Sequence, residues 1–168
     1  MQLVEAPNDW LDKTVKPFDF EKLDAVEISG KMCEIMMAQN GIGLSANQVG
    51  LDAQIFVMRP IDHPEIKKPF AIINPIVLEI GEEKINGPEG CLSYPGLVLK
   101  VTRPTKILTR FLDLNGKECI IEFSGIDARC FLHEYDHLNG VTFTDRVSKL
   151  KLSMAKKKLK KQKRLING

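Results

Sequence analysis

Apolar residues near the start of the chain recur at close to helical spacing, which predicts an amphipathic helix over residues 20–39. Its apolar side carries Leu23, Val26, Cys33 and Met37. Asn40 and Gly41 favour left-handed backbone and can end this helix. A glycine-rich turn over residues 41–48 then precedes an apolar run at residues 55–58, which predicts a strand.

Short strand-like segments follow a proline-rich loop at residues 59–69. They lie at residues 71–73, 76–80, 97–101, 105–112 and 117–123. Asn115 and Gly116 separate the last two and supply the positive φ values that a tight hairpin turn needs. Because strands stand between an early and a late helix, we predict an α+β fold with mainly antiparallel sheets.

The late helix is predicted to begin near Ser124, where Ser124 and Asp127 resemble a capping box, and to end at Asn139 and Gly140. One side of this helix carries Ile126, Cys130, His133 and His137. The other side is crowded by Ala128, Phe131, Leu132, Tyr135 and Leu138. A helix that is apolar on most sides should be buried, so we place it at the centre of the fold with the sheets packed around it.

This central helix contains the pattern His-Glu-x-x-His. His133 and His137 are four residues apart and therefore lie on one face, where they can bind one metal ion. Glu134 lies beside them and is placed to move protons. The alternative is a buried helix with two hydrogen-bonded histidines, but buried imidazoles without a ligand or a partner are costly. The pattern favours a metal site.

A catalytic metal usually has three protein ligands, and the third is not found after His137. That part of the chain has no Glu or His, and Asp145 is its only acid. Candidates upstream are His63 and several acids. Cys91 stands out, because the glycines and prolines of residues 88–96 predict a stiff, tightly turned loop around a lone cysteine.

Composition and charge indicate how the chain is divided and in which compartment the protein works. The chain has 168 residues and a net charge of +2, but nine Lys and Arg and no acid lie in residues 149–168, which leaves 15 basic and 22 acidic residues before them. Val147, Leu150 and Met154 have helical spacing, so a basic C-terminal helix can begin against the body.

The four cysteines show no CxxC spacing, and neither a secretion signal nor a long apolar segment is present, so we expect free thiols and a cytoplasmic protein.

Three motifs together resemble those of the peptide deformylase family. They are Gly41–Gln48 (GIGLSANQ), Glu89–Ser93 (EGCLS) and His133–His137 (HEYDH). The resemblance extends over residues 5–147 and implies a single catalytic domain over residues 1–147, followed by a basic tail or helix over residues 148–168. The absence of a transit peptide favours a bacterial or phage-encoded enzyme over an organellar precursor, and we expect a mature organellar form less.

The resemblance also implies the chemistry. Cys91, His133 and His137 would hold one divalent metal, Fe²⁺ in the cell, with Zn²⁺, Ni²⁺ or Co²⁺ in purified protein. Metal-bound hydroxide would attack the formyl carbon of an N-terminal formylmethionine and release formate, with Glu134 as general base and then acid. The Gln48 amide and the Leu92 N–H would stabilise the oxyanion.

Other residues receive roles from the same resemblance. The backbone of Ile42, Gly43 and Gly90 would pair with the peptide as an added strand. The methionine pocket would involve Ile42, Ile126, Cys130 and His133, and Gly43 would belong to the active-site wall. Glu89, Arg103 and Asp136 would support the ligands. Arg129 could shape the methionine pocket or pair with Asp136 or Glu89.

The resemblance to the peptide deformylases also implies which partners the protein has. We expect N-formylmethionyl nascent polypeptides as substrates, with no membrane or DNA partner. The basic tail is expected either to contact ribosomal RNA or to act as a solubilising tail. Two other classes remain open at this point: a zincin-type metallopeptidase, and a structural metal module with a basic nucleic-acid arm.

Overall fold

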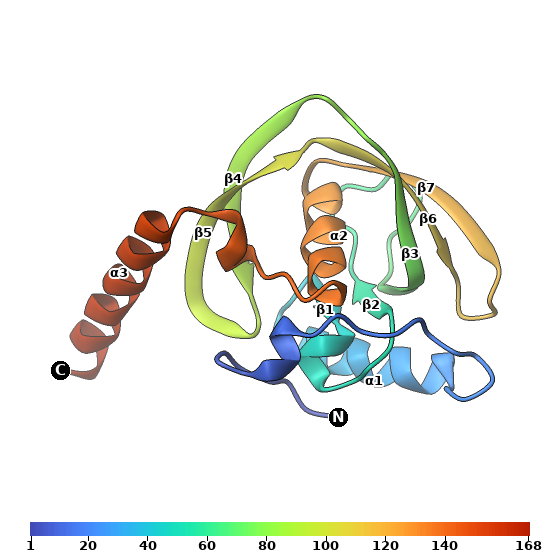
Figure 1. Cartoon of the computed structure of the whole chain (residues 1–168), viewed down its shortest axis with the longest axis horizontal. Helices are drawn as coiled ribbons and strands as arrows, with labels where there is room; N and C mark the ends of the chain where they lie inside the picture. The colour runs from blue at the N-terminus through green and yellow to red at the C-terminus, as the bar shows by residue number, and fades with distance from the viewer.

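A computed structural model describes residues 1–168 and shows two antiparallel sheets and three α-helices (Figure 1). The helices are α1 (Ala25–Ala38), α2 (Gly125–Leu138) and α3 (Lys149–Asn167), with short 3-10 turns η1 (Asp9–Asp12), η2 (Ala46–Val49) and η3 (Phe143–Arg146). The strands are β1 (Gly43–Ser45), β2 (Ile55–Met58), β3 (Phe70–Ile80), β4 (Lys84–Cys91), β5 (Tyr94–Pro104), β6 (Lys106–Leu112) and β7 (Glu118–Ser124). No helix combines the length and the apolar content needed to cross a membrane.

The strands form one sheet of five and a separate hairpin. The large sheet has the order β1-β2-β3-β6-β7, and β4 pairs only with β5. All of these pairings are antiparallel, which confirms the predicted α+β class. In Figure 1, α2 stands between the β4–β5 hairpin and strands β3, β6 and β7.

The main core lies where α1 and α2 meet the five-stranded sheet. It contains the fully buried Phe56, Phe123 and Phe131, whose rings stack edge to face or at a tilt. Ten of the fourteen residues of α2 are buried. Because this helix is enclosed by packed side chains, polar groups on it are held in fixed positions.

The first helix begins later than predicted and buries a different face. The Asp24 side chain accepts a hydrogen bond from the Glu27 N–H at 2.9 Å and caps the helix at residue 25. The buried residues are Ala25, Ser29, Met32 and Met36. Val26 and Met37, predicted on the apolar side, are instead exposed.

Two strand predictions were wrong. Residues 70–80 form one strand instead of two, with an irregularity between Ile73 and Ile76 where Asn74 has φ 48°. The expected loop at residues 88–96 is the tip of the β4–β5 hairpin, which turns only at Leu92 and Ser93. Proline and glycine weaken strands, but a strand with one partner tolerates them.

Two local turn predictions were also wrong in detail. Gly116 has φ +74°, whereas Asn115 does not have positive φ, because Asp113 closes the turn with its side chain and backbone. At the start of α2, Ser124 makes no side-chain cap. Asp127 accepts hydrogen bonds from the Ile61 and Asp62 N–H groups, so it ties the 59–69 loop to the helix.

The C-terminal residues form a continuous helix, α3, which projects from the β5 side of the molecule (Figure 1). It packs through Leu152, Ala155 and Leu159 on a small cluster of buried residues, listed as Leu97, Leu99, Val101 and Phe143. Leu150 and Met154, predicted to face the body, are exposed. The contact face of α3 is therefore displaced from the predicted one.

Candidate active site and metal centre

Three side chains with metal-binding atoms converge between α2 and the β4–β5 hairpin. The ligand atoms of Cys91, His133 and His137 all lie within 4.8 Å of one another. Cys91 Sγ is 3.4 Å from His137 Nε2. The other candidate histidine, His63, is outside this cluster, and its Nδ1 accepts hydrogen bonds from the Glu65 and Ile66 N–H groups.

This donor set fits one divalent cation. A thiolate and two imidazoles suit a borderline metal such as zinc or ferrous iron, and three protein ligands leave a position for water or substrate. His133 Nδ1 is engaged by Glu89 at 2.9 Å, which leaves Nε2 for a metal. Both histidines are buried on a packed helix, so their rings cannot move far.

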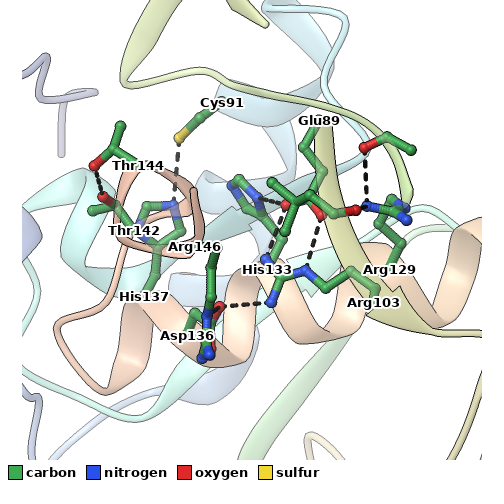
Figure 2. A network of polar contacts seen from close by, with 12 residues as sticks. Glu89, Cys91, Arg103, Arg129, His133, Asp136, His137, Thr142, Thr144 and Arg146 are labelled. Carbon is green, nitrogen blue, oxygen red and sulfur yellow. Dashed lines mark hydrogen bonds and ion pairs between the residues drawn. The ribbon is translucent and has the colours of Figure 1, made fainter. Parts of the chain in front are cut away.

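Glu89 is the centre of the polar network behind His133 (Figure 2). Arg103 donates to both of its carboxylate oxygens, each at 2.9 Å. Burial alone would raise the pKa of Glu89, but the hydrogen bonds from Arg103 and His133 outweigh it and hold the pKa at about 2. Glu89 is therefore a fixed negative charge that orients the His133 ring.

A second carboxylate lies on α2 next to His137. Asp136 accepts a hydrogen bond from Arg103 Nη1 at 2.7 Å and is held from the other side by Arg146, whose Nη2 is 2.6 Å away. Arg103 thus joins Glu89 on the hairpin to Asp136 on the helix. Figure 2 shows Arg103 between Asp136 and Glu89, with Glu89 beside His133.

Glu134 is buried beside β1. Its Oε2 atom has no hydrogen-bond partner, although it is enclosed by protein. Burial raises the pKa of this carboxyl to about 7. A carboxyl with this pKa can accept a proton and return it near neutral pH.

The side chain of Gln48 is oriented at both ends. Its Oε1 accepts hydrogen bonds from Ser45, from the N–H at 3.0 Å and from the hydroxyl at 3.2 Å. Its Nε2 therefore faces Ser93 Oγ at 3.2 Å and Cys91 Sγ at 3.4 Å. The arrangement provides an aimed N–H donor next to the cluster of Cys91, His133 and His137.

The profile of the family described as Polypeptide deformylase matches residues 1–153. The chain belongs to the peptide deformylase family. This match confirms the resemblance found in the three motifs. The chain is a hydrolase that removes the N-formyl group from the N-terminal formylmethionine of newly synthesised proteins and releases formate.

Similar proteins support the assignment. The peptide deformylase of Rhizobium meliloti is 38% identical over 152 residues, which cover 90% of this chain and 87% of the relative. The peptide deformylase of Borreliella burgdorferi is 42% identical over 147 residues, 86% of each chain. The crystal structure of Arabidopsis thaliana peptide deformylase 1B with an inhibitor has a TM-score of 0.86 and 34% identity, and covers 99% of this chain and 92% of that one.

In this deformylase the residues predicted to line the substrate path come from α2, from β4 and from the segment around β1. The buried Cys130 donates to the Ile42 carbonyl, with Sγ and the oxygen 3.4 Å apart, and so fixes α2 against the segment before β1. Ile126 is 40% exposed one turn earlier on α2. Gly90 pairs with Val98 in the hairpin.

Several supporting residues escaped the sequence analysis of the deformylase site. Ser45 holds Gln48 within the first motif through a capping box that the sequence could have shown, whereas Ser93 reaches Gln48 and Arg146 reaches Asp136 from other segments. The N-terminal segment also reaches the site, because the Val4 and Ala6 N–H groups donate to the carbonyls of Gln48 and Ser93, each at 2.8 Å. Only knowledge of the fold could have identified the contacts that join separate segments.

Proposed function

We propose that Cys91, His133 and His137 are the ligands of one divalent metal in this deformylase. The single observation that carries the proposal is the convergence of their ligand atoms within 4.8 Å. Ferrous iron is the proposed ion in the cell, and Zn²⁺, Ni²⁺ or Co²⁺ are proposed replacements in purified protein. Such a metal acidifies a bound water and polarises the formyl oxygen.

Glu134 is the proposed carrier of the proton. Its carboxyl is buried with one unpartnered oxygen and a pKa raised by burial to about 7. It would take the proton of the attacking water and deliver it to the departing amine. Both steps need a carboxyl that is held near the formyl carbon, and the packing of Gly43 against Glu134 supports such a position.

Gln48 and the Leu92 backbone N–H are the proposed donors to the oxyanion. Ser45 directs the Gln48 amide nitrogen toward Cys91, and Leu92 directly follows Cys91 at the turn of the hairpin. Donors fixed before the reaction stabilise the developing charge without reorganisation. The alternative of a zincin-type metallopeptidase predicted no role for Gln48 or Cys91.

The peptide is proposed to bind as a strand between β1 and β4. β1 is the last strand of the large sheet and β4 has only one partner, so each has an edge without a neighbouring strand. Backbone groups of Ile42, Gly43 and Gly90 would pair with the peptide, and the methionine side chain would enter near Ile126 and Cys130. Pairing through the backbone explains tolerance of many peptide sequences.

Formate release from a formyl-Met tripeptide tests the site assignment. Cys91→Ser and Glu134→Ala should each reduce kcat/KM at least a hundredfold, and Cys91→Ser should also weaken metal binding. Intact peptides without a formyl group should not be cleaved. Full activity of Glu134→Ala would rule out its role as the proton carrier, and peptide-bond cleavage would support a zincin-type reaction.

We also propose that α3 docks on ribosomal RNA. Its apolar contacts with the body use Leu152, Ala155 and Leu159, so the basic side chains on the rest of the helix are exposed. Lysines and arginines on one helix bind phosphates, and this binding weakens as salt increases. A solubilising role is the alternative.

Charge removal tests docking better than truncation, because deleting residues 155–168 would uncover the apolar cluster beneath α3. The exposed residues Lys157, Lys161 and Arg164 lie along one face and can all be changed to Gln. The triple variant should co-sediment with ribosomes less than the parent at low salt, while formate release from a tripeptide stays the same. If the triple variant and the parent co-sediment with ribosomes to the same extent, at low salt and at high salt, then α3 is a solubilising element and does not dock.

A further inference from the structure

Arg129, on the second turn of α2, directs its side-chain hydrogen bonds to the β4–β5 hairpin. Its Nη1 donates to Glu89 Oε2 at 2.7 Å and to the Val101 carbonyl at 2.7 Å, with the Gly87 carbonyl at 3.2 Å. Its Nη2 donates to the Ile85 carbonyl at 3.0 Å. Of the partners considered from the sequence, Arg129 pairs with Glu89 and not with Asp136 (Figure 2).

These contacts matter because the hairpin is not part of the large sheet. β4 hydrogen-bonds only to β5, so no backbone ladder fixes the hairpin to the rest of the core. Cys91 ends β4, whereas His133 and His137 lie on α2. The hairpin tip has one backbone hydrogen bond from outside, from the Ala6 N–H to the Ser93 carbonyl, so the distance from the thiol to the two imidazoles depends mainly on side chains that connect the hairpin to the helix.

Two arginines make this connection in opposite directions. Arg103 belongs to β5 and reaches Asp136 on α2, and it also pairs with Glu89 inside its own hairpin. Arg129 belongs to α2, and all four of its acceptors lie on β4 or β5. The Arg129 side chain is 13% exposed, so the contact between its guanidinium and the Glu89 carboxylate is largely shielded from water.

The fit around Arg129 requires a flat group with several donors. A Cβ built on Gly87 would lie 3.1 Å from Arg129 Nη2, so the guanidinium is packed closely on the β4 backbone. A guanidinium can donate to a carboxylate and to carbonyls on both strands at once. A lysine ammonium retains the charge but lacks the planar fork that reaches all four acceptors.

We propose that Arg129 is a positioning residue that sets Cys91 at its distance from His133 and His137. The inference rests on the ligand set proposed above. Arg129 acts through Glu89, which is two residues before Cys91 on β4 and also holds His133 Nδ1. One carboxylate thus fixes the orientation of one ligand and the position of the strand that carries another.

The experiment measures Co²⁺ affinity by competition with a chelator, together with the visible absorption of the Co²⁺ protein. Arg129→Gln should weaken binding about 10- to 100-fold, the range for residues that orient metal ligands. Arg129→Lys should recover only part of this loss. Arg110→Gln is the matched control, because the Arg110 side chain is 41% exposed and its carboxylate partner Glu118 is as far as 3.9 Å away, so the Co²⁺ affinity of this variant should equal that of the parent.

Further measurements separate positioning from other roles. Thermal unfolding of the metal-free variants identifies any general loss of fold. If Arg129→Gln does not fold, the Co²⁺ affinity of Arg129→Lys is compared with that of the parent instead. A Co²⁺ affinity within twofold of the parent, with a raised KM for formyl-Met peptides, would overturn the inference in favour of a pocket role. Cys91→Ser is the reference: if it too leaves Co²⁺ affinity unchanged, the ligand set itself is wrong and the inference fails with it.

Discussion

A Cβ atom built on Gly43 would lie 2.5 Å from Oε1 of Glu134. The same atom would be 2.9 Å from Cys130 Sγ, so it would meet two residues of α2 at once. Gly43 is fully enclosed in β1 and its backbone pairs with Met58 of β2. The glycine is thus required by the close approach of the helix that carries the proposed proton carrier, and not by a positive φ.

Replacement of Gly43 by Ala should displace the Glu134 carboxyl. Because the β1 backbone is fixed by its pairing with β2, the side chains on α2 must move instead. A shift of about 1 Å in a reacting group can reduce the rate by about a hundredfold, so we expect kcat/KM for a formyl-Met peptide to fall by about 10- to 100-fold. Circular dichroism should remain that of the parent.

Gly30→Ala is the matched control for this substitution. Gly30 lies inside α1, and a Cβ there would have no atom within 4 Å. Alanine in a helix interior is favoured over glycine by about 0.5–1 kcal/mol, so this variant should be more stable at unchanged activity. Equal activity of Gly30→Ala and Gly43→Ala would show that the position of Glu134 is not limiting.

Gln48→Glu should remove the proposed oxyanion donor while nearly conserving shape. The Oε1 side would still accept hydrogen bonds from Ser45, but the group facing Cys91 would become an acceptor with a negative charge. Loss of one such donor typically reduces kcat about 10²- to 10³-fold. Formate release should show this loss, and Gln39→Glu on the exposed end of α1 should not. A kcat within threefold of the parent would exclude Gln48 as a donor.

The parts of the site that were predictable from the sequence are those set by local geometry. His133 and His137 lie on one helical face because they are four residues apart. The whole helix was recognisable from its apolar sides, and the family motifs pointed to Gln48 and Cys91. The register of α1 was missed because its apolar residues occur on more than one side, so only packing selects the buried face.

The β4–β5 hairpin could not be predicted from local pattern. β4 reads Lys-Ile-Asn-Gly-Pro-Glu-Gly-Cys, a composition typical of turns, and becomes a strand because β5 supplies a partner. The family resemblance pointed to Glu89, Arg103 and Asp136 as supporting residues, but not to how they connect the hairpin with α2. Arg103 and Asp136 are 33 residues apart in the chain and meet only after the hairpin packs beside α2.

Arg103 and Arg146 both contact Asp136 but should differ in their effect on stability. The Arg103 side chain is 5% exposed and serves two buried carboxylates, whereas the Arg146 side chain is 47% exposed. Arg103→Met should lower the free energy of unfolding by about 3 kcal/mol, because two buried carboxylates each lose a charged partner, although Glu89 keeps Arg129 and Asp136 keeps Arg146. Arg146→Gln should cost about 1 kcal/mol or less, since water screens the contact. Urea unfolding measures both, and equal losses would contradict this difference.

The Cys130 thiol provides a pH-dependent prediction. Burial, aided by the negative charge of Glu134, raises the pKa of this thiol well above its ordinary value. The folded protein therefore retains the proton, whereas the unfolded thiol loses it above about pH 8.5. Ionisation then lowers the free energy of the unfolded state but not that of the folded state. The stability contributed by Cys130 is therefore present below that pH and is lost as the pH rises.

Comparison with Cys130→Ala isolates this contribution, because all other groups titrate in both proteins. Each pH unit above the unfolded pKa costs the parent about 1.4 kcal/mol, so the free energy of unfolding of the parent relative to Cys130→Ala should fall by about 2 kcal/mol between pH 8 and pH 10. Urea unfolding at several pH values gives this difference directly. The size of the cavity left by alanine does not affect the slope with pH. A difference that stays constant over the range would mean that the thiol ionises equally in the folded and unfolded states, and hence that the contact with the Ile42 carbonyl does not keep it from water.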